Sequence, residues 1–163
     1  QCLSLYSLIM NANEQLINHF YTCFKNKDYK GMQACYAENA TFSDAVFKNL
    51  NSAQVRAMWQ MLISKGKDMR IEFGQISANE KTGKAHWDAY YTFSSTGKKV
   101  INKIDASFEF ENGKIVKHID DFNFYAWAKQ ALGTTGLLLG WTGFLKNKIQ
   151  ATAKTNLQKF MEK

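Results

Sequence analysis

Apolar and polar residues alternate along three consecutive stretches between residues 83 and 127. Two turn signals, at residues 94–97 and 111–113, separate these stretches. Alternation with a period of two, many β-branched and aromatic residues, and short glycine-containing turns are typical of antiparallel strands. The pattern therefore predicts a meander of three long strands.

Successive side chains of a strand point to opposite faces, so each predicted strand has two faces. The odd-numbered positions of the first strand are mostly apolar and predict a core face. Its even-numbered positions include His86 and Asp88 beside aromatic residues, and the third strand repeats this mixture with His118 and Asp120. We interpret the two mixed faces as walls of one cavity, which Asp88 and Asp120 both enter.

Apolar residues at three- and four-residue spacing predict helices in other parts of the chain. We expect helices over residues 13–25, 29–36, 51–64, 124–132 and 137–163, strands over 40–47 and 69–78, and a linker over 134–136. The expected helix N-caps are Asn13, Asp28 and Asn51. This order of elements predicts an α+β fold, in which a curved antiparallel sheet wraps N-terminal helices and leaves a pocket between them.

The composition indicates one globular domain. The chain has 163 residues, of which 45% are hydrophobic, and no apolar stretch approaches the ~20 residues of a membrane span. The net charge of +7 comes from lysines spread over the chain with only two arginines, which argues against nucleic-acid binding. Cys23 and Cys35 lie among apolar residues without metal-ligand spacing, so we expect buried free thiols, no metal site and a cytoplasmic location.

The chain divides into three parts. Residues 1–10 are expected to be an extension or tag-like arm, because residues 1–9 lack the basic start of a signal peptide. A domain over residues 11–133 follows, and then a C-terminal helical extension over residues 134–163. The apolar stripe of this extension needs a cover, either the pocket mouth, the sheet or a partner subunit, and its basic face leaves contact with a membrane surface open.

Three stretches, residues 36–44, 108–116 and 118–122, together with the order of elements, resemble the SnoaL-like group of the nuclear transport factor 2-like superfamily. The resemblance covers about residues 12–133 and implies a cone-shaped fold. The group includes ketosteroid isomerases, limonene-epoxide hydrolases and polyketide cyclases. Its members often pair through the sheet, which implies a homodimer.

The resemblance to epoxide hydrolases implies a site made of a basic residue and two aspartates. His86, Asp88 and Asp120 stand at the matching positions, with histidine in place of the family's arginine. Phe42 and Asp44 stand where those enzymes have a tyrosine and an asparagine that help to hold water.

The resemblance to ketosteroid isomerases points to other residues. Asp44 matches the aspartate that carries the proton, and Phe20, with Tyr21 beside it, matches the tyrosine that binds the oxyanion. The second aspartate of those enzymes matches Asp105, which its parity places on the polar face of its strand.

These observations predict a small enzyme of isomerase, cyclase or hydrolase type that needs no cofactor. It would act on a hydrophobic, oxygen-bearing molecule by acid–base chemistry of its aspartates. The expected catalytic residues are Asp88, Asp120, His86 and Asp44, and the expected ligand-binding residues are Phe42, Met58, Trp59, Tyr90, His118 and Phe122. The alternatives are a non-catalytic module that binds an apolar ligand or partner in the same cavity, and a structural dimer.

Overall fold

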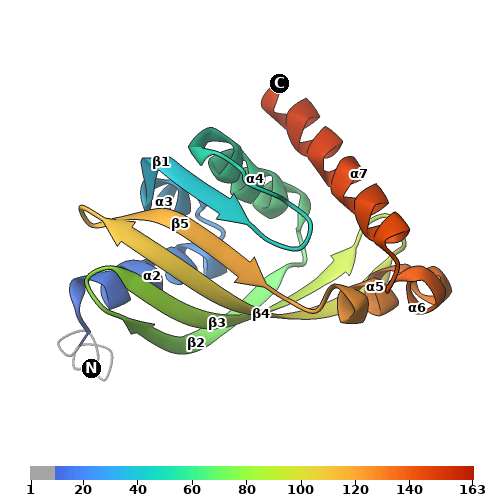
Figure 1. Ribbon diagram of the computed structural model, residues 1–163, viewed down its shortest axis with the longest axis horizontal. Coiled ribbons are helices and arrows are strands. Elements are labelled where there is room, and N and C mark those ends of the chain that lie inside the picture. Colours follow the sequence, from blue (N-terminus) through green and yellow to red (C-terminus); the bar gives the residue numbers. More distant parts are fainter. Residues whose placement is uncertain (1–9) are drawn as a thin grey trace.

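The computed structural model describes residues 10–163 (Figure 1). The predicted N-terminal arm, except Met10, lies outside the described residues. The helices are α2 (Ala12–Lys25), α3 (Tyr29–Ala34), α4 (Ser52–Lys65), α5 (Phe124–Leu132), α6 (Thr134–Leu139) and α7 (Gly143–Met161). The strands are β1 (Tyr36–Ser43), β2 (Arg70–Ala78), β3 (Thr82–Phe93), β4 (Lys98–Glu111) and β5 (Lys114–Asp121).

The five strands form one sheet in the order β1-β5-β4-β3-β2, with β1 parallel to β5 and all other pairs antiparallel. The sheet curves around α2, α3 and α4, as Figure 1 shows. We call the concave face toward these helices the inner face and the opposite one the outer face. The predicted α+β fold with a curved sheet, N-terminal helices and an additional C-terminal helix is confirmed.

Polar side chains fix where the helices begin. Asp28 and Asn51 cap α3 and α4 as predicted, since each side chain accepts a hydrogen bond from a backbone N–H in the first turn. The cap of α2 is Asn11, and not Asn13, because Asn11 forms a reciprocal capping box with Glu14. The amide of Asn13 donates instead to the carbonyl of Asn79, which joins α2 to the turn between β2 and β3.

Two local features set the register of the meander. Asn112 and Gly113 both have positive φ, which is typical of the tight turns that favour Asn-Gly between antiparallel strands. The pairing of β4 with β5 then shifts at Val116, so that β5 holds one extra residue there. This shift turns Ile115, rather than Val116, into the core.

The main core lies between the inner face of the sheet and the first three helices. Ile17, Phe20 and Tyr21 of α2 are fully buried against it. Gly83 is required where α2 crosses β3, because a Cβ atom there would lie 2.8 Å from Ile17 Cδ1. Burial of each large side chain contributes about 1.5–3 kcal/mol, so this layer fixes how α2 sits in the curve of the sheet.

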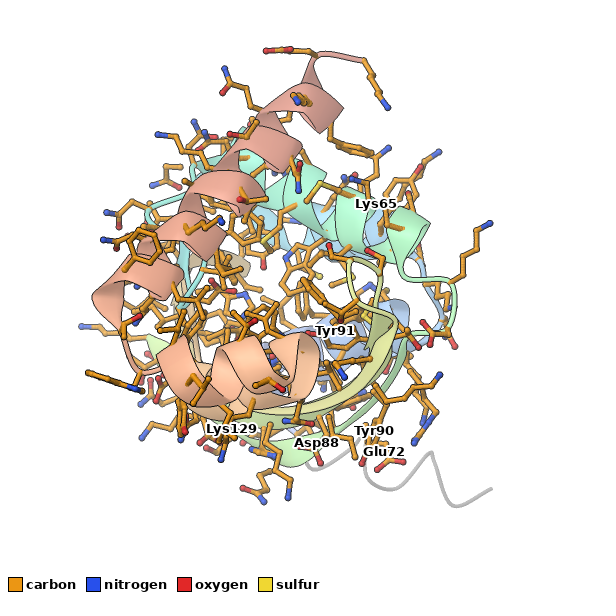
Figure 2. All side chains as sticks on the ribbon, turned by 90° about the vertical axis from the view of Figure 1, so that its right-hand side faces the viewer. Lys65, Glu72, Asp88, Tyr90, Tyr91 and Lys129 are labelled. Carbon is orange, nitrogen blue, oxygen red and sulfur yellow. The ribbon has the colours of Figure 1, made fainter. Side chains whose placement is uncertain are left out.

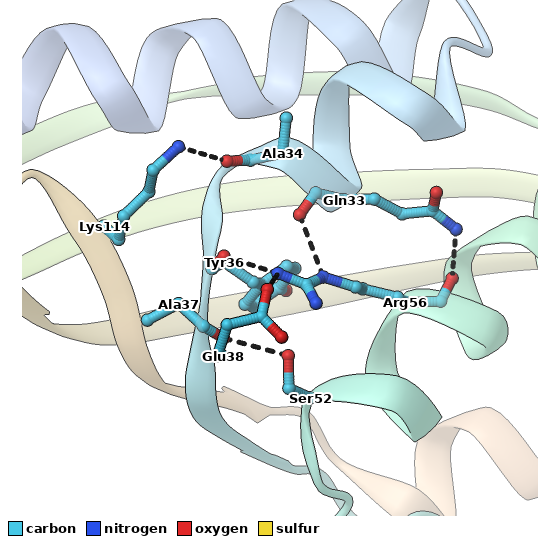
Figure 3. Close-up of polar contacts among 8 residues, drawn as sticks. All are labelled: Gln33, Ala34, Tyr36, Ala37, Glu38, Ser52, Arg56 and Lys114. Atoms are coloured by element: carbon cyan, nitrogen blue, oxygen red, sulfur yellow. Dashed lines mark hydrogen bonds and ion pairs between the residues drawn. The ribbon is translucent and has the colours of Figure 1, made fainter.

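The junction of α3, β1 and α4 is held by side chains that reach backbone carbonyls (Figure 3). Arg56 donates to the carbonyls of Gln33 and Tyr36, and it pairs with the carboxylate of Glu38 at 3.1 Å. Ser52 donates to the carbonyl of Ala37 at 2.9 Å. These bonds fix the start of β1, and with it the Tyr36 side chain that points into the core.

Three predicted boundaries are wrong. The strand expected over residues 40–47 is β1, which begins at Tyr36 and ends at Ser43. The linker expected over residues 134–136 is the first turn of α6, and the helix expected over 137–163 is interrupted before it continues as α7. The buried stripe of α7 begins at Leu145 and packs toward α4, whereas Leu137 and Trp141 are exposed.

Candidate functional site

A cavity of about 370 Å³ opens between the inner face of the sheet and α4, α5 and α7. Its wall is mostly apolar. The C-terminal helix forms part of this wall through Ile149 and Ala153, so it closes one side of the cavity. A position at the pocket was one of the alternatives considered for this helix from the sequence. Two aspartates, Asp44 and Asp120, and the phenol of Tyr91 are among the polar groups that line it.

The sheet separates the aspartates that the sequence analysis placed together. Asp120 is buried on the inner face, but Asp88 lies on the outer face, because Trp87 and Ala89 on either side of it point inward. Figure 2 shows Tyr91 inside the curve of the sheet and Tyr90 and Asp88 outside it. The prediction that Asp88 and Asp120 face one enclosed space is therefore wrong.

His86 lies outside with Asp88, and its two ring nitrogens are 2.9 Å from Asp88 Oδ1 and 2.7 Å from Asp105 Oδ1. These carboxylates raise the pKa of His86 above its ordinary value, chiefly through the hydrogen bond with Asp105. The epoxide-hydrolase resemblance needs His86, Asp88 and Asp120 around one substrate, and the fold does not bring them together.

A chain of buried hydrogen bonds ends on Asp120. The indole of Trp59 donates to the Tyr36 hydroxyl at 2.9 Å, and this hydroxyl lies 2.7 Å from His118 Nδ1. His118 Nε2 lies 2.9 Å from Asp120 Oδ1, which also accepts from the Trp87 indole at 3.4 Å. Both contacts use Oδ1, and Asp120 lines the cavity, so a ligand there can donate a hydrogen bond to Oδ2.

One arrangement of protons satisfies this whole chain. Tyr36 accepts from Trp59 and donates its own proton to His118 Nδ1, and the neutral imidazole then donates from Nε2 to Asp120. If Nδ1 carried the proton, the hydroxyl hydrogen of Tyr36 would lose its acceptor. His118 therefore holds the Asp120 carboxylate in one orientation from behind the cavity wall.

Asp44 sits in the turn that follows β1. Its Oδ1 accepts from the backbone N–H groups of Val46 and Phe47 at 2.7 and 2.6 Å. Burial raises the pKa of Asp44 to about 6 against the lowering effect of these bonds, and the negative charge of Asp120 adds to the rise. A carboxyl group that titrates near neutral pH in an apolar pocket is suited to take and return a proton.

Tyr91 supplies the third polar group. Its hydroxyl oxygen accepts from the Trp127 indole at 2.7 Å, so its O–H can donate to a ligand. Burial raises the pKa of this phenol above its usual value, and the nearby charge of Asp44 raises it further. The hydroxyl therefore keeps its proton at neutral pH and can donate a hydrogen bond to an oxygen atom.

The predicted ligand-binding residues divide into three groups. Met58, Trp59 and Phe122 line the cavity. Phe42 and His118 are buried behind the wall, where their rings meet edge to face at 5.0 Å. Tyr90 lies on the outer face, under the guanidinium of Arg70.

Tyr91 and Tyr36 were not among the site residues predicted from the sequence. Tyr91 lay on the strand face assigned to the core, and this parity was a signal that it points inward. Tyr21, beside the position that resembles the oxyanion tyrosine, is fully buried, and its hydroxyl has no hydrogen-bond partner among the described residues. It does not line the cavity.

The family model "SnoaL-like domain" matches residues 17–118, and the chain belongs to this family. No curated protein sequence matches the chain.

Solved structures share the fold at low sequence identity. A candidate polyketide cyclase from Pseudomonas putida is 18% identical, with a TM-score of 0.62 over 75% of this chain and 98% of that one. An LEH-like epoxide hydrolase from M. tuberculosis is 15% identical, with a TM-score of 0.60 over 82% and 95% of the two chains. An NTF2-like protein of unknown function from Burkholderia pseudomallei is 19% identical, with a TM-score of 0.61 over 70% and 92%. These likenesses confirm the nuclear transport factor 2-like fold.

Three further observations concern the described residues. Cys23 and Cys35 are free and buried, as predicted. Within residues 10–163, His, Cys, Asp and Glu do not gather in groups of three or more that could hold a metal ion. None of the helices described is both long and apolar enough to span a bilayer.

Proposed function

We propose that this protein catalyses proton transfer on a hydrophobic, carbonyl-bearing small molecule, as an isomerase or cyclase that needs no cofactor. The observation that carries the proposal is the convergence of Asp44, Asp120 and the Tyr91 hydroxyl on one apolar cavity. The family supports a small-molecule role, and neighbours described as candidate polyketide cyclases agree with it. Hydrolysis of an epoxide is less well supported, because the sheet separates the residues that would perform it.

Each polar group has a role in this proposal. The Asp44 carboxylate removes a proton from the carbon next to a carbonyl group, and the electron pair of that C–H bond moves onto the carbonyl oxygen. Tyr91 donates a hydrogen bond to the resulting enolate oxygen, which stabilises it in a site of low dielectric constant. Protonated Asp44 returns the proton to another carbon in an isomerisation. In a cyclisation the enolate carbon attacks a second carbonyl, whose π electrons move onto its oxygen, and protonated Asp44 gives its proton to the alkoxide that forms. Oδ2 of Asp120 orients the substrate by accepting from a hydroxyl group.

Proton exchange tests this role without knowledge of the natural substrate. A panel of hydrophobic enones and β-diketones would be incubated with the protein in deuterated water, and exchange next to the carbonyl would be followed by NMR. We expect Asp44→Asn to slow enzyme-dependent exchange at least about 100-fold, because it removes the base. Tyr91→Phe should slow it about tenfold or more, because it removes one oxyanion donor.

Asp121→Asn is the matched control. Asp121 follows Asp120 on β5 but is exposed, so the same change of charge occurs outside the cavity. Equal rates for the wild type, Asp44→Asn and Asp121→Asn would contradict catalysis by Asp44. Tight binding of a panel member without exchange, together with co-purifying apolar material in mass spectra, would favour the non-catalytic binding module instead.

Pairing of two copies through the sheet and a cytoplasmic location remain predictions. Light scattering during size-exclusion chromatography would test the first, since a monomer at micromolar concentration would contradict it.

A further inference from the structure

The end of α6 and the start of α7 carry most of the large apolar side chains that the described part of the chain exposes. Five of the eight such residues between positions 10 and 163 fall between positions 137 and 144, with exposed fractions from 43% to 75%. They are Leu137, Leu138, Leu139, Trp141 and Phe144, and we call them the apolar tip. Soluble proteins rarely expose such a group unless it meets another apolar phase.

Several polar groups at the apolar tip are hydrogen-bonded inside the protein. The Trp141 indole donates to the carbonyl of Leu138 at 3.0 Å, and the Tyr125 hydroxyl donates to the carbonyl of Leu137 at 3.1 Å. Thr142 donates both its hydroxyl and its backbone N–H to the carbonyl of Leu139. These groups do not need water, which lowers the cost of moving the tip out of water.

The tip is held firmly by the helix beneath it. Gly136 of α6 lies so close to α5 that a Cβ atom there would be 1.8 Å from the carbonyl oxygen of Ala128. The helices α5 and α6 and the start of α7 gather at the end of the molecule that lies opposite the N-terminal side in Figure 1. The apolar side chains are therefore presented at one extremity.

The segment of the chain that contains the tip carries only positive charge. Residues 122–161 contain five lysines and no aspartate or glutamate. Lys129 lies on α5 and Lys146 and Lys148 lie in the first turns of α7, close to the tip in the chain and in the fold. The lysines of this segment form no ion pair within residues 10–163, so their charges are available to an anionic partner.

We propose that the apolar tip inserts into the interfacial region of an anionic lipid bilayer, while Lys129, Lys146 and Lys148 contact the headgroup phosphates. Exposed leucines with a tryptophan and a phenylalanine, flanked by lysines, are what such an interface binds. A second copy fits this surface less well, because a two-fold contact would bring two sets of unpaired lysines together. The proposal does not depend on the reaction in the cavity.

Vesicle sedimentation tests this proposal directly. The full chain would be mixed with vesicles of phosphatidylcholine alone or with added phosphatidylserine, at low and high salt. We expect binding to the anionic vesicles that weakens with salt. The double variant Trp141→Ser/Phe144→Ser should lower the partition coefficient at least about tenfold, because both rings then no longer enter the bilayer.

Two matched controls separate the tip from general effects of composition. Ile101→Ser/Ile119→Ser removes two exposed apolar side chains from the outer face of the sheet and should leave binding unchanged. Lys146→Glu/Lys148→Glu should abolish the preference for anionic vesicles. The control Lys84→Glu/Lys103→Glu changes the net charge of the protein by the same amount but should weaken this preference much less.

Three results would overturn the proposal. One is a wild-type protein that stays in the supernatant with both vesicle types, and another is an equal loss of binding in the matched controls. The third is a tip variant that changes from dimer to monomer in light scattering while the wild type ignores vesicles, which would assign the tip to self-association.

Discussion

The inner and outer faces of the sheet each carry a histidine and an aspartate two residues apart on one strand. In His118–Asp120 and in His86–Asp88, the Nε2–Oδ1 distance is the same 2.9 Å. The inner pair is 0% and 3% exposed, and the outer pair is 29% and 22% exposed. The same local arrangement therefore stands in two different environments, and the environment decides what each pair can do.

The inner pair is part of a chain of hydrogen bonds among rings. Tyr36 and Trp59 fix His118 from one side, and His118 fixes Asp120 at the cavity wall. The outer pair belongs to a surface network in which His86 bridges Asp88 and Asp105, and Lys103 stands opposite Asp88 on β4. An identical motif is thus a positioning device on one face and an ordinary surface interaction on the other.

The largest expected effect comes from replacing the histidine of each pair, one at a time, with phenylalanine. His118→Phe keeps a ring of similar size but leaves the Tyr36 hydroxyl without its acceptor and Asp120 buried with one long hydrogen bond. We expect it to lower the free energy of unfolding by about 3 kcal/mol or more, because it breaks a buried, hydrogen-bonded pair. His86→Phe should cost less than about 1 kcal/mol, because water can replace its partners. Urea unfolding of both variants measures the two values, and equal costs would break the comparison.

The sequence predicted the strands of the meander and the inward face of β3, because alternation over twelve residues leaves little freedom of register. It did not predict that the even positions of β3 and β5 lie on opposite faces. Strand parity is a local property, and the relation between two strands depends on their pairing. Here Ala85 pairs with Ala106 and Ala106 with Asp120, so Asp120 shares its face with the odd positions of β3.

The extra residue at Val116 also shows a limit of pattern analysis. Strict alternation along β5 would place Val116 on the same face as His118 and Asp120, and the last two do share a face. The shift places Ile115 in the core instead of Val116. A single inserted residue has no signature in composition. Tyr91 differs, because the parity of β3 did predict that it points inward, but nothing distinguished it from the core aromatic residues beside it.

A second effect concerns Asp44, the other inner carboxyl group. Its pKa of about 6 lies above the ordinary value of 3.8, so the folded state favours the protonated form. The stability that this group contributes is complete below about pH 4 and is lost as pH rises through about 6.

The amide introduced by Asp44→Asn cannot ionise, and its oxygen can still accept hydrogen bonds from the backbone N–H groups of Val46 and Phe47. The stability of this variant relative to the wild type should rise by about 2 kcal/mol between about pH 4.5 and 7.5.

Urea unfolding across this pH range measures the Asp44 effect, and Asp121→Asn serves as the control on the outer face. A constant difference between Asp44→Asn and the wild type would mean that burial does not perturb Asp44. The comparison of inner and outer carboxyl groups would then lose its electrostatic basis.

The smallest expected effect belongs to the outer histidine. Asp105 and Asp88 raise the pKa of His86, and Glu72 and Lys103 lie next to Asp88 on the neighbouring strands, so their charges act on the same cluster. A histidine with a raised pKa stabilises the folded state at pH values below the ordinary histidine pKa near 6.5, and this contribution is lost as pH rises through the raised pKa.

NMR titration of His86, with His86→Gln to assign the resonance, should find the midpoint above about 6.5. Thermal unfolding should show a loss of less than about 1 kcal/mol over the same interval in the wild type but not in His86→Gln, because the partly exposed cluster is screened by water. A midpoint at or below about 6.5 would show that the two carboxylates do not hold His86 in its charged form, so that the outer network is weaker than its distances suggest.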